Sequence, residues 1–245
     1  MNTANLILKI KKLSQVSRSF FLLKNLFYYR VLAAVEHKPI FLRELNTIID
    51  IGANRGQFSL ASRFWAPQSK IIAFEPLPYP SEVFRKIFIN DANVSLINAA
   101  VGPEKGLVEM HLSERDDSSS LLPIGKDQVY IFPGTQEISV LKVEVAPLSH
   151  FINANVIISP SMLKIDVQGF EMQVLKGSKN LLHLFDYIYC ECSFIELYVG
   201  QNLVSDVISF LDTMGFNMAG VYNLCSDRSG RAIQADFFFI KRSII

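Results

Sequence analysis

The stretch that decides the fold is Ile49-Asp50-Ile51-Gly52-Ala53-Asn54-Arg55-Gly56-Gln57-Phe58, in which an apolar run passes directly into a glycine turn and then into a helical pattern. Glycine adopts positive φ without strain and lets a ligand approach the backbone closely. The N-terminus of the following helix presents N–H groups to an anion. The stretch therefore predicts a strand, a tight turn and a helix that together bind the anionic group of a cofactor.

The sequence around this stretch alternates short apolar runs with longer helical segments, which is typical of βαβ units and a parallel sheet. We predict helices over about 170–184 and 203–214, and strands over 47–51, 70–74, 94–97, 162–166 and 187–191. Additional strands over 106–112 and 137–145 interrupt this winding, and 216–224 pairs with 235–241 as a hairpin. The expected fold is α/β, with helices on both faces of a mostly parallel sheet that ends in an antiparallel hairpin.

A second element, Phe74-Glu75-Pro76, ends the next predicted strand, nineteen residues after Gly56. A carboxylate at this place accepts hydrogen bonds from both hydroxyls of a ribose. S-adenosylmethionine fits this pair of elements, with its carboxylate at the helix N-terminus and its ammonium at Asp50. The expected cofactor-binding residues, which include an amide placed to meet the adenine, are Asp50, Gly52, Asn54, Gly56, Glu75 and Asn98.

Binding of a nicotinamide dinucleotide is disfavoured, because that reading requires G-x-G-x-x-G and the corresponding positions hold Gly52, Asn54 and Gln57. A phosphate-binding G-x-x-x-x-G-K-[ST] loop is also missing from the sequence. An oxidoreductase therefore stays a third option, behind an adenosylmethionine enzyme and a protein that binds without turnover.

The third element is Leu163-Lys164-Ile165-Asp166-Val167-Gln168-Gly169-Phe170-Glu171-Met172-Gln173-Val174-Leu175-Lys176-Gly177. Together with the two earlier stretches it resembles the FkbM-type methyltransferases, over about residues 47–240. The resemblance implies a Rossmann-like class I methyltransferase sheet and adenosylmethionine-dependent O-methylation of a sugar, glycan or natural-product-like acceptor. Gln168 replaces the family's usual acid, so a catalytically inactive methyltransferase-fold binding protein is the alternative.

The candidate catalytic residues are two carboxylates at the carboxyl ends of central strands, Asp166 and Glu191, where open α/β sheets place their ligands. Methyl transfer to an alcohol requires alignment of the acceptor oxygen and removal of its proton. His111 and His150 are weaker competitors for the base. The sequence shows no metal-ligand spacing, and we expect no metal. Ser118-Ser119-Ser120 reads as a polar surface loop or as part of a loop over the acceptor.

Residues 1–46 are expected to form a basic amphipathic helical extension, separate from a methyltransferase domain over 47–245. The extension holds eight Lys and Arg against Glu36 and Glu44, within a chain of net charge +1. It is interpreted as a helical cap on the sheet, with peripheral contact to an anionic membrane as the alternative. The balanced overall charge argues against a nucleic-acid partner. The three cysteines and the lack of a signal peptide indicate the cytoplasm, and the sequence gives no sign of the oligomeric state.

Overall fold

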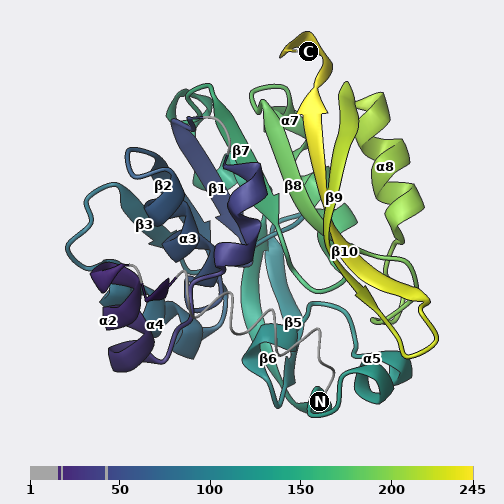
Figure 1. Cartoon of the computed structure of the whole chain (residues 1–245). Helices are drawn as coiled ribbons and strands as arrows, with labels where there is room; N and C mark the ends of the chain where they lie inside the picture. The colour runs from purple at the N-terminus through teal and green to yellow at the C-terminus, as the bar shows by residue number, and fades with distance from the viewer. Residues whose placement is uncertain (1–15, 18, 42–43, 245) are drawn as a thin grey trace.

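A twisted seven-stranded sheet forms the centre of the molecule in this computed structural model, which describes residues 16–17, 19–41 and 44–244 (Figure 1). The spatial order is β3-β2-β1-β7-β8-β10-β9. The bounds are Thr47–Ile51 for β1, Lys70–Phe74 for β2, Val94–Ile97 for β3, Ser161–Ile165 for β7, Tyr187–Ser193 for β8, Phe216–Ser226 for β9 and Ala232–Lys241 for β10. The first five are parallel and β10 runs antiparallel to β8 and β9, which confirms the predicted architecture.

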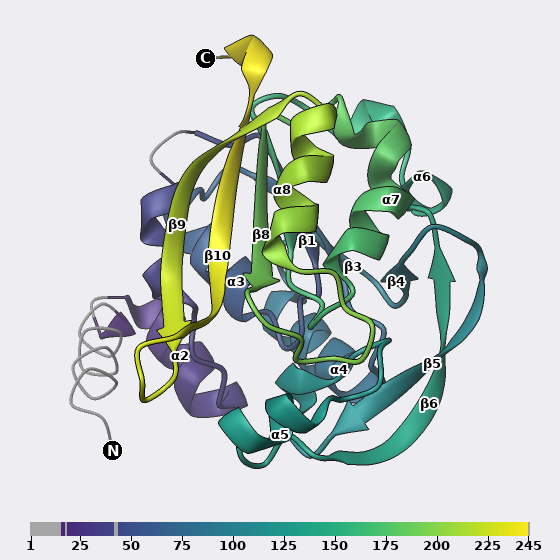
Figure 2. The same ribbon diagram turned by 90° about the vertical axis from the view of Figure 1, so that its right-hand side faces the viewer.

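The parallel strands are short apolar runs because helices cover both of their faces. One face packs against α6 (Leu148–Phe151), α7 (Glu171–Leu182) and α8 (Val204–Thr213). The other face packs against α2 (Phe20–Tyr29), η1 (Val35–Ile40), α3 (Gln57–Trp65) and α4 (Pro78–Phe88). Figure 2 shows these two helical layers on opposite sides of the strands. Consecutive residues of β1 point to opposite faces, so Ile49 and Ile51 join the first core, whereas Ile48 joins the second.

A separate three-stranded sheet carries the additional strands that the sequence predicts. Its order is β4-β6-β5, with β4 at Ala100–Val101, β5 at Gly106–Ser113 and β6 at Glu137–Ala146. Between β5 and β6 lie η2 (Asp116–Ser118) and α5 (Lys126–Ile131), and η3 (Ala154–Val156) precedes β7. This small sheet lies beside the carboxyl ends of the central strands (Figure 1). It therefore forms a wall next to the region where the fold places its ligands.

The described part of the predicted N-terminal extension is helical and packs into the same core as the rest of the chain. Leu22, Val31 and Val35 are each at most 2% exposed, and they join residues of α3 and α4 in one cluster. The Ala34 amide also donates to the carbonyl of Gln57 at the start of α3. Residues 1–15 lie outside the described residues. In the part of the chain that is described, no helix has both the length and the apolar character to cross a membrane.

The C-terminal hairpin contains irregular pairing that matters for the site. Tyr222 pairs with Asp236 and Cys225 with Gln234, so Asn223 and Leu224 on β9 stand opposite the single residue Ala235 on β10. This is a β-bulge, which bends a strand and redirects its side chains. Asn223 adopts a φ of 50°, in the left-handed region. The last described residues form a short 3₁₀ helix, η4 (Arg242–Ile244).

Candidate active site

The candidate site is a cavity of about 510 Å³ at the carboxyl ends of the central strands. It lies where the strand order reverses, since β2 and β3 follow β1 on one side and β7 and β8 follow it on the other. Open α/β sheets bind ligands at such a switch point. The strand order divides the lining residues between two ends. The end toward β2 and β3 holds Gly52, Asn54, Phe74, Glu75, Leu77 and Ala99, and the end toward β8 and β10 holds Glu36, His37, Asp166, Glu191, Asn223 and Asp236.

The glycine turn is held against both neighbouring strands. The amides of Gly52 and Ala53 donate to the carbonyl of Phe74 at the end of β2. Gly52 has a φ of +79°, and a Cβ there would lie 1.8 Å from the backbone oxygen of Asp166. Glycine is therefore required by conformation and by space. Gly56 does not line the cavity: its φ is +93°, and a Cβ there would approach the rings of Phe84 and Phe88 to 3.0 Å.

Glu75 is fixed at the opening of the turn. Its Oε2 accepts from the amide of Asn54 at 2.9 Å, and its Oε1 accepts from the amide of Leu77 at 2.8 Å. The residue is 4% exposed, and its carboxylate still lines the cavity. Burial raises the pKa of Glu75 to about 7, against the opposing effect of the two backbone donors. The two amides hold the carboxylate in a defined orientation toward the cavity.

Asp50 has a different place from the one predicted. Its side chain is fully buried, with Oδ2 accepting from Ser59 Oγ at 2.7 Å and Oδ1 lying 3.0 Å from Lys164 Nζ. Lys164 also donates to the carbonyl of Gly52 at 2.8 Å. Burial lowers the pKa of Lys164, but the charges of Asp50 and Asp166 outweigh it and raise the pKa overall. Asp50 therefore lies behind Lys164 and has no surface for direct contact with a cofactor ammonium.

Asn98 was predicted to meet the adenine, but the structure places its side chain elsewhere. Its Nδ2 donates to the carbonyl of Glu75 at 2.7 Å and to that of Pro76 at 3.1 Å. The same nitrogen lies 2.9 Å from Ser81 Oγ. Asn98 is not among the residues that line the cavity. Ser81 Oγ also donates to the Glu75 carbonyl, at 2.8 Å, so Asn98 and Ser81 together hold the backbone beneath Glu75.

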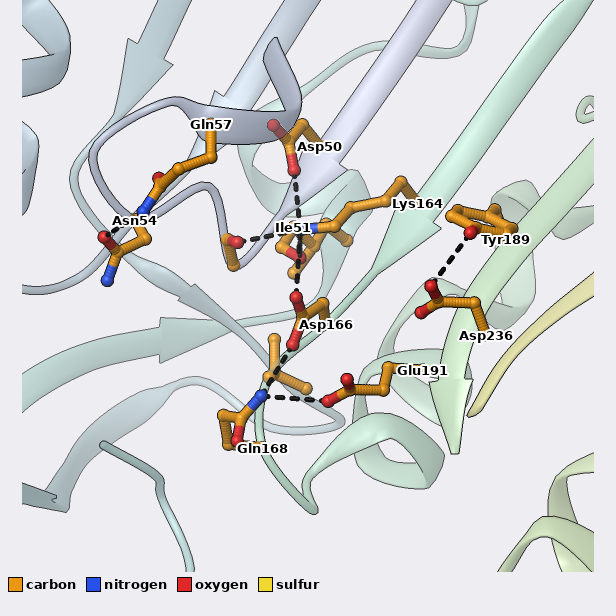
Figure 3. A network of polar contacts seen from close by, with 12 residues as sticks. Asp50, Ile51, Asn54, Gln57, Lys164, Asp166, Gln168, Tyr189, Glu191 and Asp236 are labelled. Atoms are coloured by element: carbon orange, nitrogen blue, oxygen red, sulfur yellow. Dashed lines mark hydrogen bonds and ion pairs between the residues drawn. The ribbon is translucent and has the colours of Figure 1, made fainter. Parts of the chain in front are cut away.

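The two predicted catalytic carboxylates are joined by one amide (Figure 3). Nε2 of Gln168 donates to Asp166 Oδ1 at 2.8 Å and to Glu191 Oε2 at 3.0 Å. The remaining Glu191 oxygen accepts from Gln234 Nε2 at 2.9 Å. Burial, followed by the charge of Asp166, raises the pKa of Glu191 well above its usual value. The structure therefore brings Asp166 and Glu191 together, and both oxygens of Glu191 are engaged by amides.

A second polar group occupies the end of the cavity beside the hairpin. Tyr189 OH lies 2.8 Å from His37 Nδ1 and donates to Asp236 Oδ2 at 2.9 Å. Asn223 Nδ2 donates to the same Asp236 oxygen at 2.6 Å. The sequence did not single out these four residues, and neither did it assign a role to Lys164. They come from η1, β8, β9 and β10, so only the fold brings them together.

The loop that follows β5 covers part of the cavity. Arg55, in the glycine turn, donates from Nε to Asp116 Oδ2 at 2.8 Å. Ser118, Ser119 and Ser120 are at most 6% exposed, and Ser119 lines the cavity. The interpretation of these serines as a polar surface loop is therefore wrong. Ser120 Oγ donates to the carbonyl of Gln168 at 2.6 Å, which ties the loop to the two carboxylates.

The other candidates lie away from the cavity. His111 Nδ1 is 2.8 Å from Glu137 Oε2 on the small sheet, and His150 Nε2 is 3.3 Å from Lys105 Nζ. Glu171 is 3% exposed and accepts from the amide of Gly169 at 2.8 Å, which caps the start of α7. Within the described ranges, no group of three His, Cys, Asp or Glu side chains has the geometry to hold a metal ion.

A comparison with known protein families shows the family to which this chain belongs. The model of the methyltransferase FkbM domain matches residues 50–218, more than half of the chain. The chain belongs to the FkbM methyltransferase family. This FkbM protein is accordingly an S-adenosylmethionine-dependent methyltransferase, as its three sequence elements indicate.

Two curated methyltransferases illustrate the similarity. The 2-O-methyltransferase NoeI of Sinorhizobium fredii is 28% identical over 172 residues, covering 67% of this chain and 70% of its own. Methyltransferase sdnD of Sordaria araneosa is 30% identical over 156 residues, covering 53% of this chain and 59% of its own. The FkbM chain thus spans less than two thirds of sdnD. A solved putative tRNA (m1A22) methyltransferase of Streptococcus pneumoniae, in complex with S-adenosyl-L-methionine, has a TM-score of 0.48 at 11% identity, covering 84% of this chain and 71% of that chain.

Proposed function

We propose that this FkbM methyltransferase transfers the methyl group of S-adenosylmethionine to a hydroxyl oxygen of a sugar, glycan or similar polyhydroxylated small molecule. One observation carries the proposal: a single cavity joins the glycine turn and the carboxylate of Glu75, at one end, to a group of carboxylates and amides at the other. Carboxylates and amides hydrogen-bond hydroxyl groups. The name of NoeI, a 2-O-methyltransferase, agrees with transfer to oxygen.

The residues of the first end fit the cofactor. The volume of the cavity lies in the range of small-molecule sites. We expect Glu75 to accept the ribose hydroxyls, the turn at Gly52 and Asn54 to receive the amino-acid group, and Phe74, Leu77 and Ala99 to contact the adenine. When bound, adenosylmethionine supplies an electrophilic methyl group on a sulfonium. Asp50, Gly56 and Asn98 support this site from behind, through Lys164, α4 and the Glu75 backbone respectively.

At the other end, we propose that Asp166 contacts the acceptor. Its side chain is 39% exposed, whereas that of Lys164 beside it is 6% exposed. Its Oδ2 lies 3.9 Å from Lys164 Nζ, and its Oδ1 is held by Gln168. A carboxylate held in this way orients a hydroxyl with little loss of its own rotational freedom. Glu191, with both oxygens bonded to amides, has a positioning role for Gln168.

A small-molecule acceptor is favoured over nucleic acid by the charge of the acceptor end. Glu36, Asp166, Glu191 and Asp236 line it, and acidic side chains repel a phosphate backbone. We expect the protein to leave total tRNA unmethylated. Incorporation of tritium from labelled adenosylmethionine into tRNA above the level of a no-enzyme control would contradict this part of the proposal.

The protein is proposed to act in a reducing compartment such as the cytoplasm. Cys190 and Cys192 are free, with their sulfur atoms 3.7 Å apart on one face of β8. Residues i and i+2 of a strand point to the same face of the sheet, where their side chains are poorly placed to form a disulfide with each other. Both are buried, as expected for cysteines that act as small apolar residues.

Calorimetric titration tests the cofactor site. We expect the wild type to bind S-adenosylmethionine but not NAD, and Glu75→Ala to weaken this binding by about 10- to 100-fold, because a hydrogen bond to a charged group is lost. Glu82→Ala is the matched control, since Glu82 is exposed on α4 and bonds Lys86. Absence of binding to folded wild-type protein would overturn the proposal. Tight binding without methyl transfer to any acceptor would favour the inactive binding protein instead.

A further inference from the structure

The β9 bulge builds a carboxylate site at the acceptor end of the cavity. Because two residues of β9 face one residue of β10, Asn223 and Leu224 turn to line the cavity. Asn223 holds a φ of 50°, a conformation that costs energy for a residue other than glycine. Its side chain reaches Asp236 on the neighbouring strand. The strained backbone thus places one amide donor beside one buried carboxylate.

The two oxygens of Asp236 have different surroundings. Oδ2 accepts from Asn223 at 2.6 Å and from Tyr189 at 2.9 Å, and it lies 3.6 Å from His37 Nδ1. Among the residues that the structure describes, none hydrogen-bonds to Oδ1, and Oδ1 is not enclosed by protein. The Asp236 side chain lines the cavity. One oxygen is therefore fixed by protein donors, and the other is available to a ligand.

The charges around Asp236 come from every element that packs against it. His37 approaches from η1, with Glu36 near Tyr189, and Lys164 and Asp166 approach from β7 and its end. Tyr189 and Glu191 approach from β8, and Tyr222, the cross-strand partner of Asp236, from β9. Burial raises the pKa of Asp236 to about 6, and its donors Asn223 and Tyr189 oppose this rise. A carboxylate with such a pKa is ionised at neutral pH and is a stronger base than an exposed aspartate.

We propose that Asp236 is the general base of the methyl transfer, which rests on the proposed function. Oδ1 accepts the hydrogen bond of the reacting hydroxyl. The oxygen–hydrogen bond breaks as the acceptor oxygen bonds the methyl carbon, while the carbon–sulfur bond breaks and the sulfonium becomes a neutral thioether. The proton passes to Oδ1 and from there to solvent. Tyr189 and Asn223 are positioning residues that fix Oδ2.

The first test measures turnover and binding on a panel of methyl glycosides of hexoses and 6-deoxyhexoses. Turnover is followed by release of S-adenosylhomocysteine, and binding by saturation-transfer NMR with that product present. We expect Asp236→Asn to lower kcat by about 10²- to 10⁴-fold. Its calorimetric Kd for adenosylmethionine should stay within about twofold of the wild type, since Asp236 lies at the other end of the cavity. An unchanged kcat in this variant would overturn the proposal.

The second test separates Asp236 from the other carboxylates by its hydrogen bonds. Tyr189 donates to Asp236, whereas Tyr198 OH bonds Gln168 Oε1 at 3.0 Å, on the amide that joins Asp166 to Glu191. Loss of a donor to a carboxylate raises its pKa. We expect Tyr189→Phe to move the rising limb of the kcat–pH profile upward by roughly one unit. Tyr198→Phe should leave that limb in place, and the opposite pattern would assign the base to the Asp166 group.

These outcomes are distinguishable from failure of the proposed function. If the wild type does not bind adenosylmethionine, the cofactor site itself is wrong. If it binds the cofactor but neither binds nor methylates a glycoside of the panel, the cofactor site stands. The proposal that Asp236 removes the proton from a hydroxyl of a polyhydroxylated acceptor is then wrong.

Discussion

Lys164 is the residue on which the geometry of the site depends most directly. Its ammonium lies between the buried carboxylate of Asp50 and the carbonyl of Gly52, and it is 5.5 Å from the centre of the Phe58 ring. A buried ion pair contributes little net stability, but one of its charges left alone in the interior is costly. Lys164 therefore holds the glycine turn in place while it neutralises Asp50.

We predict that Lys164→Met lowers the free energy of unfolding by about 3–5 kcal/mol, because Asp50 would remain as an uncompensated buried charge. The double variant Asp50→Asn with Lys164→Met should recover part of this loss, since both charges are then absent. Urea denaturation followed by circular dichroism measures both values. Equal stability of the single and double variants would contradict the ion-pair account.

Gly52 allows the cost of backbone conformation to be separated from the cost of crowding. Gly52 and Gly200 share a φ of +79°, but a Cβ at Gly200 would meet nothing within 4 Å. We expect Gly200→Ala to cost about 1–2 kcal/mol, the penalty for an L-residue in the left-handed region. Gly52→Ala should cost more and abolish adenosylmethionine binding, because its Cβ would collide with the backbone of Asp166. Comparable unfolding curves for the two variants would rule out the collision.

Among the elements, α2 has a buried side and an exposed side of different character. Leu22 and Asn25 pack inward, whereas Phe20, Phe27 and Tyr28 are 83%, 76% and 78% exposed. The exposed positions of the helix also include Lys24, and Arg30 follows it. Aromatic and basic residues on one surface suit the boundary of an anionic membrane. The two roles predicted for the N-terminal segment, a cap and a membrane contact, would therefore use opposite sides of α2.

We predict that the wild type co-sediments with vesicles containing anionic lipid and that Phe20→Ser with Phe27→Ser reduces this binding several-fold, because the buried apolar area is lost. Tyr130→Ser is the matched control, since Tyr130 is 86% exposed on α5. Removal of all residues before Arg43 would be a poorer test of membrane binding, because it would also remove His37 and the buried Val35. Wild-type protein that stays in the supernatant would argue for a cap alone.

The elements were more predictable from the sequence than the site. Strands such as β1 and β2 are short, mostly apolar runs bounded by turns, so their limits follow from the sequence. Asp236 and Asn223 lie in the hairpin, whose alternating pattern contains no sign of the bulge that joins them. Lys164 reads as a charge within a buried strand, and its partner Asp50 is identified only when β1 and β7 pair. Three-dimensional proximity of this kind has no local sequence signal.

At the scale of the whole molecule, buried carboxylates set the response to pH. Burial raises the pKa of both Glu75 and Glu171 to about 7, from ordinary values of 4.5. Between these values the folded protein binds more protons than the unfolded chain, so stability falls as pH rises. Below pH 4.5 both carboxyl groups are protonated in the folded and in the unfolded state, so the difference in bound protons disappears.

We predict that the Tm of the cofactor-free protein decreases between about pH 5 and pH 8. Each of the two pKa shifts lowers the free energy of unfolding by up to about 3 kcal/mol across this window. Glu171→Gln should flatten the profile, because the amide keeps an acceptor for Gly169 and does not ionise. Calorimetric scans at several pH values provide the measurement. A Tm that rises over this range in the wild type would refute the assignment.

The contact between His37 and Asn223 joins residues 186 positions apart, with the nitrogens 3.3 Å from each other. The wall beside Asp236 is thus assembled from the beginning and the end of the described chain. During synthesis on the ribosome, the glycine turn and Glu75 emerge long before the hairpin does. A nascent chain that lacks β9 and β10 also lacks Asn223 and Asp236, so under the proposed assignment methyl transfer can begin only after the last strands have been released and paired.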